Sequence, residues 1–403
     1  MKVQLMTKKF LGNIDRRDFL NGMALTGAAG AMLSPMELMA NMGAAPEEYY
    51  PPSKTGLRGS HVGSFEVAHS VSWQGKDWGT PKDQTDDVYD MVVVGGGISG
   101  LSAAFLYQQK TGGGKKVLIL DNHDDFGGHA KRNEFDIDGK KVIGYGGSQT
   151  IMDPGKYSPE AKKLLKDISI ETDRFNDYFD QDFYKKWNMS SHIYFSKKDY
   201  GKDLLIRNPF SLDEAVLGEV DGGFGPAERM QKIREFPISR EAQDSIIQMV
   251  SNAKDHFTDL TTEEKMDKLR SITYTDYLQQ YYHMPKDATD IFRDSSKAVW
   301  AVGWDALSAL EAVRLGMPGT WAYEDVSKRV STHIIPTEPY ISHFPDGNAG
   351  VARSLVRKLN PQAVPGNTME DLVQARVNYD LLDQEHSDVR IRLNSTAVDV
   401  KHT

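Results

Sequence analysis

Residues 88–134 read VYDMVVVGGGISGLSAAFLYQQKTGGGKKVLILDNHDDFGGHAKRNE, and this stretch decides the fold. Met91–Val94 is a short apolar run that predicts a buried parallel strand, and it ends at three consecutive glycines. Gly100 completes the pattern G-x-G-x-x-G, and the residues after it have the composition of a helix. In such a turn Gly95 permits the tight bend, Gly97 lets the backbone approach a pyrophosphate, and Gly100 lets the helix pack closely on the strand. The stretch therefore predicts a strand, a turn and a helix whose N-terminus faces phosphate groups.

A second predicted strand, residues 116–120, ends at Asp121. A carboxylate at this point can accept hydrogen bonds from a ribose 2′-hydroxyl. Its separation from Gly95 exceeds the usual spacing of about 20 residues, and the glycine-rich loop at residues 111–114 accounts for the excess. A G-x-G-x-x-G triplet arises easily by chance in a chain with 35 glycines. Strand, glycines, helix, strand and acid in this order are a specific signal, and they predict an α/β, Rossmann-like domain.

Two more glycine turns follow, Phe126-Gly127-Gly128-His129 and the segment GYGGS at residues 144–148. A domain for NAD alone would continue directly into another strand–helix unit. Here the additional backbone-exposing turns come where a long, extended dinucleotide would pass. We therefore interpret the cofactor as FAD and the fold as a Rossmann-like FAD/NAD(P)-binding domain, with a parallel sheet and flanking helices.

Composition excludes several functions. The chain has 403 residues and a formal net charge of −9, and it has no block of basic residues, so we expect no nucleic-acid partner. It has no cysteine, which excludes c-type haem attachment, a thiolate nucleophile, an iron–sulfur centre and any cysteine-based zinc site.

The N-terminal region, residues 1–45, resembles an export signal. Lysines precede Arg16-Arg17, and a charge-free run rich in Gly and Ala follows from Phe19 to Met36. This order is typical of a twin-arginine signal, so we expect a periplasmic protein. The run is too weakly apolar for a stable membrane span.

The rest of the chain divides by composition. Residues 46–87 are rich in Pro, Gly and Ser and predict an extended segment that wraps over the cofactor domain. Residues 88–155 form the first part of that domain, residues 156–335 an inserted, mostly helical cap, and residues 336–403 the return to the domain. Within the cap, Tyr274, Tyr277 and Tyr281 share one helical face. They fit either helical packing or an aromatic cage for a cationic amine.

Two features stand out in the last part of the chain. Residues 342–350 are turn formers before a predicted helix at residues 351–359, an arrangement that can face an anion or simply begin a helix. Residues 388–393 and 397–401 alternate in the manner of two strands, and we expect a hairpin there.

Several stretches together resemble the bacterial spermidine dehydrogenase family, within the flavin amine oxidase superfamily. They are the Arg16-Arg17 signal, GLRGSHVGSFEVAH, VVVGGGISGLSAA, DNHDDFGGHAKRNEF, GYGGSQ and HFPDGNAGVARSLVRKLNP. The resemblance implies an exported flavoprotein that oxidises a polyamine, with haem b beside FAD. Chains of that family continue past the position of Thr403, so we expect this chain to be truncated at its C-terminus.

The resemblance also implies a chemistry and a set of contacts. A C–N bond of a small cationic amine is oxidised by hydride transfer to flavin, and the electrons pass to an acceptor that the sequence does not identify. We expect cofactor contacts from Gly95, Gly97, Ser99, Gly100, Asp121, Gly128, His129 and Gly147. His61 or His69 is a candidate axial ligand of haem iron; the sequence assigns no catalytic base. The alternatives are a flavin amine oxidase or desaturase with another substrate, and an inactive remnant of a split or frameshifted gene.

Overall fold

The computed structural model describes residues 49–54, 63–79, 83, 85, 87–180, 182–187, 189–210, 225–330 and 341–401. The described chain forms two compact units. Unit 1 contains the residues up to Ile151, Tyr157–Phe175 and those from Ser342 onward, and unit 2 contains Met152–Lys156 and Asn176–Ile341. Unit 2 is therefore inserted in the sequence of unit 1. The twin-arginine region and His61 lie outside the described residues.

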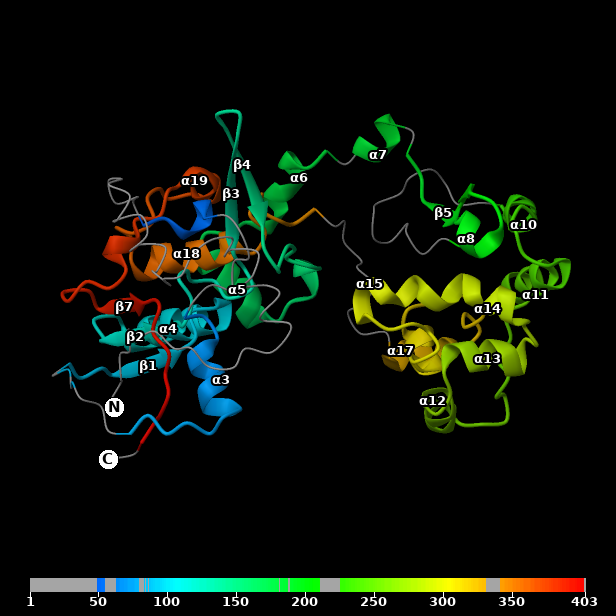
Figure 1. Ribbon diagram of the computed structural model, residues 1–403, viewed down its shortest axis with the longest axis horizontal. Coiled ribbons are helices and arrows are strands. Elements are labelled where there is room, and N and C mark those ends of the chain that lie inside the picture. Colours follow the sequence, from blue (N-terminus) through cyan, green and yellow to red (C-terminus); the bar gives the residue numbers. More distant parts are fainter. Residues whose placement is uncertain are drawn as a thin grey trace, which may run out of the picture. The chain divides into compact units, whose positions relative to one another are not determined.

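Unit 1 is built on a parallel sheet with the strand order β1-β2-β7 (Figure 1). The strands are β1 (Met91–Val94), β2 (Val117–Leu120) and β7 (Val389–Arg392). β2 is buried along its whole length, as expected of the central strand of a parallel sheet. The first two strands and the intervening helix α4 (Ile98–Thr111) lie within a few residues of the predicted positions.

The expected hairpin at the end of the chain is not formed, and that prediction was wrong. β7 pairs in parallel with β2, and residues 397–401 are not a strand. β7 is an edge strand of the described sheet, and Val389 and Ile391 are buried in the apolar core of unit 1, which favours its pairing with β2. After β7 the N–H of Ser395 donates to the Asp121 carbonyl oxygen at 2.7 Å, so the chain continues past the end of β2 instead of turning back.

Helix α4 and helix α18 (Ala349–Leu359) pack against each other in unit 1 (Figure 1). Leu101 and Ala104 of α4 and Leu355 of α18 are fully buried, and a buried leucine contributes about 1.5–3 kcal/mol relative to an exposed one. Gly112 is the C-cap of α4. Gly112, Gly113 and Gly114 have φ angles of 80°, 86° and 68°, with open space around each. This glycine loop leads back to β2.

The other elements of unit 1 surround this core. β3 and β4 form an antiparallel hairpin, and its turn residues Asp138 and Gly139 both have positive φ, as a type I′ turn requires. Tyr50, in the segment expected to wrap over the domain, is buried, and its hydroxyl donates to Glu134 at 2.7 Å. Part of that segment is helical instead of extended. The elements of unit 1 outside the parallel sheet, α4 and α18 are η1 (Pro51–Ser53), α3 (Glu66–Ser72), β3 (Arg132–Ile137), β4 (Lys140–Tyr145), α5 (Pro159–Asp167), η3 (Thr172–Arg174), α19 (Met369–Gln374) and η5 (Tyr379–Leu381).

The segment 157–175 begins inside the predicted cap region, yet Ile168, Ile170 and Phe175 pack in the apolar core of unit 1. Helix α5 has the predicted start: Ser158 is its N-cap and accepts a hydrogen bond from the Ala161 N–H. Among the described residues, no helix has both the length and the apolar character needed to cross a bilayer.

Unit 2 is mostly helical and has a small antiparallel sheet, β5-β6. Its core is aromatic: Tyr274, Tyr277 and Tyr323 are fully buried. The hydroxyls of Tyr274 and Tyr277 donate to the carbonyl oxygens of Pro318 and Gly319, so these two tyrosines pack in the core. The elements are η2 (Pro154–Lys156), α6 (Phe175–Tyr178), α7 (Phe183–Lys186), β5 (His192–Phe195), α8 (Lys197–Tyr200), β6 (Leu204–Arg207), α10 (Pro226–Arg234), α11 (Arg240–Ser251), α12 (Thr262–Arg270), α13 (Tyr274–Tyr281), α14 (Lys286–Arg293), η4 (Asp294–Ser296), α15 (Lys297–Trp300), α16 (Ala309–Arg314) and α17 (Glu324–Val330).

Candidate dinucleotide-binding site

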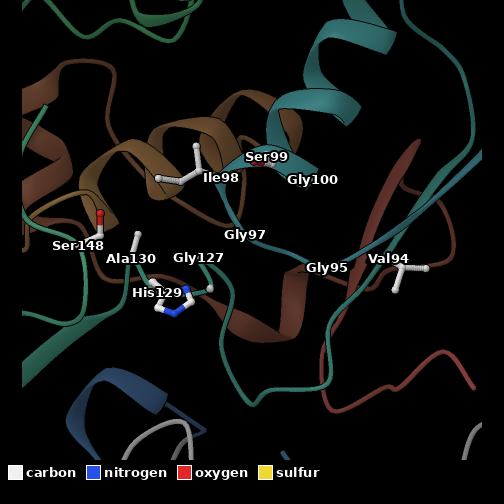
Figure 2. Close-up of a pocket in the computed structure, with 11 residues that line it drawn as sticks. Val94, Gly95, Gly97, Ile98, Ser99, Gly100, Gly127, His129, Ala130 and Ser148 are labelled. Atoms are coloured by element: carbon white, nitrogen blue, oxygen red, sulfur yellow. The ribbon is translucent and has the colours of Figure 1, made fainter. Parts of the chain in front are cut away.

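A cavity of about 380 Å³ lies at the carboxyl end of β1, within unit 1. Figure 2 shows Val94 and Gly95 at one end of its lining, His129 and Ser148 at the other, and Gly97 between them. Ligands of open parallel sheets bind at this edge, where the strands end and the helices begin. The cavity is lined by Val94, Gly95, Gly97, Ile98, Ser99, Gly100, Gly127, Gly128, His129, Ala130 and Ser148.

The first glycine turn has the geometry that its sequence predicts. Gly95 has a φ of +106°, which an L side chain rarely adopts. A Cβ at Gly100 would lie 2.0 Å from the Gly95 carbonyl oxygen, so the helix can approach the strand only because residue 100 has no side chain. Gly97 is the N-cap of α4, no side chain caps the helix, and its first turn contains no acid. The N–H groups at the start of α4 are therefore available to an anion.

The second glycine turn is bonded directly to the first. The N–H of Gly127 donates to the Gly96 carbonyl oxygen at 2.8 Å, and Gly97 and Gly127 form a parallel bridge. A Cβ at Gly128 would lie 3.3 Å from the Gly97 Cα. Because both turns lack side chains at their contact, backbone forms this part of the cavity. Such a surface fits the diphosphate of an extended dinucleotide.

Asp121 lies at the end of β2, as predicted, but it does not line the cavity. Its carboxylate accepts hydrogen bonds from the N–H groups of Gly96, at 2.7 Å, and His123, at 2.8 Å. Burial raises the pKa of Asp121, but hydrogen bonds from the His123 ring and from these two N–H groups outweigh it and lower the pKa below its ordinary value. The ionised carboxylate thus braces the first glycine turn. A carboxylate has about four lone-pair sites, so Asp121 can brace the turn and still accept a hydrogen bond from a ribose hydroxyl. That contact stays a prediction.

The structure brings together most of the predicted contact residues. Gly95, Gly97, Ser99, Gly100, Gly128 and His129 all line the cavity. Gly147 does not, although its N–H donates to the His129 carbonyl oxygen at 2.9 Å. Its neighbour Ser148 lines the cavity instead and was missed. A hydroxyl directly after a glycine pair was the available signal.

The haem prediction finds no support in the described residues. His69 lies in α3, where its ring stacks on Trp73 with ring centroids 3.8 Å apart and also contacts Phe65. Local packing therefore explains this histidine.

Residues 93–168 match the protein family described as an NAD(P)-binding Rossmann-like domain. This match covers both glycine turns and the residues that line the cavity. Unit 1 therefore carries a Rossmann-like domain.

Two further comparisons complete the picture. No curated protein matches the chain. Among solved structures, the chain is similar to wild-type putrescine oxidase bound to putrescine, with 13% sequence identity and a TM-score of 0.31. The similarity covers 75% of this chain and 50% of the putrescine oxidase chain.

Proposed function

We propose that the chain binds FAD in the unit 1 cavity and oxidises the C–N bond of a small cationic amine, a polyamine of the spermidine type. The observation that carries the proposal is the hydrogen bond between the two glycine turns, from Gly127 to Gly96. It extends the phosphate-binding turn into a second stretch of exposed backbone. NAD alone requires only the first turn, whereas a longer, extended dinucleotide uses both.

The residues around the cavity would bind and orient the cofactor. The N–H groups at the start of α4 would hold the diphosphate, with the exposed hydroxyl of Ser99 as a further donor. His129 lies beyond the second glycine turn, on the side away from Val94 (Figure 2), and would contact the flavin half. Bound FAD would supply the hydride acceptor for amine oxidation.

The substrate brings its own requirement. An alkylamine has a pKa of about 10.4, by comparison with lysine, so it reaches the enzyme protonated. It must lose one proton before the carbon next to nitrogen can give up hydride. A desolvated site favours the neutral amine, since burial disfavours a charge. The chain's net charge of −9 is compatible with a cationic substrate.

Flavin binding is tested first. We expect the purified full-length chain to bind added FAD, with a flavin absorption spectrum that differs from that of free FAD, and to bind NADH more weakly. Gel filtration after loading should keep the flavin with the protein. Preferential binding of NADH, or binding of neither dinucleotide, would contradict the proposal.

Substrate class is tested on the loaded protein. Anaerobic addition of spermidine should bleach the flavin absorption, and an aldehyde product should accumulate when an artificial electron acceptor is supplied. Putrescine and a simple monoamine complete the panel. Faster bleaching by the monoamine than by spermidine would reject a polyamine as the substrate. If no amine bleaches the flavin, amine oxidation is rejected.

We also propose export to the periplasm through the Arg16-Arg17 signal. Replacing both arginines with lysine should keep the protein in the cytoplasm, as fractionation would show. Haem b enters the proposal only if the purified protein shows a Soret band that is lost in His61→Ala or His69→Ala.

A further inference from the structure

A turn far along the chain packs against Ser148, a residue that lines the cavity. Gly347 has a φ of +61°, and a Cβ on it would lie 2.5 Å from the Ser148 carbonyl oxygen. The N–H of Asn348 donates to the same oxygen at 3.0 Å. This turn, Asp346-Gly347-Asn348, therefore lies directly against the backbone of a cavity-lining residue. It does not line the cavity itself, and Asn348 is the N-cap of α18. Of the two roles that the sequence left open, the turn therefore begins a helix.

The side chain of Asn348 fixes the direction of the Ser148 hydroxyl. Its Nδ2 donates to the Ser148 Oγ at 2.8 Å and to the Thr150 carbonyl oxygen at 3.1 Å. A carbonyl oxygen can only accept, so the amide nitrogen must face Thr150, and this determines which way the amide points. The Ser148 Oγ is then an acceptor toward Asn348, and its own hydrogen is left to donate elsewhere. Within the described ranges, this hydroxyl has no second protein partner, and Ser148 lines the cavity.

Buried charges hold the same turn in place. Asp346 is 1% exposed, and its carboxylate accepts a hydrogen bond from Arg132 at 3.0 Å and lies 3.7 Å from the Arg353 guanidinium. Arg132 begins β3, directly after the segment with the second glycine pair. Movement of the turn would separate these charges and leave each of them buried without its partner, which costs free energy. The ion pairs therefore hold the turn in place. One turn thus joins the segment after the second glycine pair, through Arg132, to Ser148, through Asn348.

We propose that Asn348 is a positioning residue that holds the Ser148 hydroxyl as a hydrogen-bond donor toward the bound dinucleotide. Ser148 is the contact residue, and Asn348 acts through it. The inference rests on the proposed FAD site. It adds to that site the pair Ser148 and Asn348, which lie 200 residues apart in the sequence.

A double-mutant cycle tests this coupling in the full-length chain. Ser148→Ala and Asn348→Ala should each weaken FAD binding, measured by flavin fluorescence, by about 3- to 10-fold, the range of one hydrogen bond. In the Ser148→Ala background, Asn348→Ala should have little further effect, since the group it positions is gone. Equal losses from Asn348→Ala with and without Ser148, or no loss from Ser148→Ala, would overturn the proposal.

A matched control separates positioning from general stability. Asn360 lies at the other end of α18, and its side chain donates to the Leu381 carbonyl oxygen at 2.6 Å, away from the cavity. Asn360→Ala should lower the melting temperature and leave the FAD affinity unchanged. If it weakens FAD binding as much as Asn348→Ala does, positioning by Asn348 is rejected.

A readout without cofactor keeps the two proposals distinguishable. In the cofactor-free protein, Asn348→Ala should speed hydrogen exchange at residues 147–150, and Asn360→Ala should not. A wild-type chain that binds no FAD would refute the proposed function, whereas unchanged exchange in Asn348→Ala would refute positioning by Asn348.

Discussion

The glycines of the first turn should separate stability from binding. An alanine Cβ at position 100 would lie 2.0 Å from the Gly95 carbonyl oxygen and 3.0 Å from a Val93 methyl carbon. The helix would have to withdraw by about 1.4 Å to restore an ordinary 3.4 Å contact with that oxygen. A gap of about 0.5–1 Å already forfeits a quarter to a half of the dispersion attraction, and the fully buried Leu101 would lose such contacts. We therefore expect Gly100→Ala to cost about 3 kcal/mol of unfolding free energy, the upper end for overpacking.

Gly97→Ala is the matched comparison. Its φ of −73° suits alanine, and the nearest atom to a new Cβ is the Gly128 Cα at 3.9 Å. Stability should change by less than about 1 kcal/mol. The methyl group would, however, stand between the two glycine turns, and FAD affinity should fall by at least about 10-fold, or about 1.4 kcal/mol.

Urea unfolding of the two variants measures the loss of stability, and flavin titration measures the loss of FAD affinity. Hydrogen exchange of the α4 amides shows whether the loss in Gly100→Ala lies in unit 1. The reasoning fails if Gly97→Ala is destabilised as much as Gly100→Ala, or if Gly100→Ala unfolds like the wild type.

Three further outcomes follow from buried polar groups. Asp121→Asn should lower the free energy of unfolding by about 1–3 kcal/mol at neutral pH. Because the pKa of Asp121 is lowered from 3.8, the wild type loses this stabilisation as the pH falls below that value. Urea unfolding at neutral pH and at about pH 3 measures the difference. Tyr50→Phe removes a hydrogen bond to Glu134 and should cost about 1.5–3 kcal/mol. Despite burial, hydrogen bonds from Lys141, Tyr50 and Arg132 hold the Glu134 pKa at about 2. The stabilisation from these bonds is therefore fully present above pH 4.5 and is lost as the pH falls toward 2. In an acid titration followed by circular dichroism, Tyr50→Phe should unfold at a higher pH than the wild type. Tyr277→Phe should lower the free energy of unfolding by about 1 kcal/mol and leave the KM for amine unchanged. A large rise in KM would instead favour the aromatic cage over helical packing.

Local pattern was enough to predict the start of the domain. The apolar run at Met91–Val94, the glycine turn and the acid at Asp121 each depend on neighbours within a few residues, and the structure has all three in the predicted order. Helix starts with a Ser-Pro signal, as at Ser158, were equally readable because the cap bonds to its own first turn.

Long-range pairing was not readable. Val389–Arg392 joins β2 across more than 260 residues of chain, and nothing near it in the sequence distinguishes a strand that pairs in parallel with a distant strand from half of a hairpin. The hydrogen bond between Ser148 and Asn348 was not readable for the same reason, since the two residues lie far apart in the chain. The turn at Asn348 was noticed in the sequence, but its contact with Ser148 could come only from the fold.

The two connections that flank β2 differ in what insertions and deletions they allow. Gly112, Gly113 and Gly114 are left-handed and surrounded by open space, and lengthening such a loop costs only about 0.6 kcal/mol per doubling. The connection from Asp121 to Gly127 has both ends bonded to Gly96, so one added residue would pull the second glycine turn out of register. Homologous chains should therefore vary in length before β2 and keep it constant after, and a peptide tag or reporter domain belongs in the first connection.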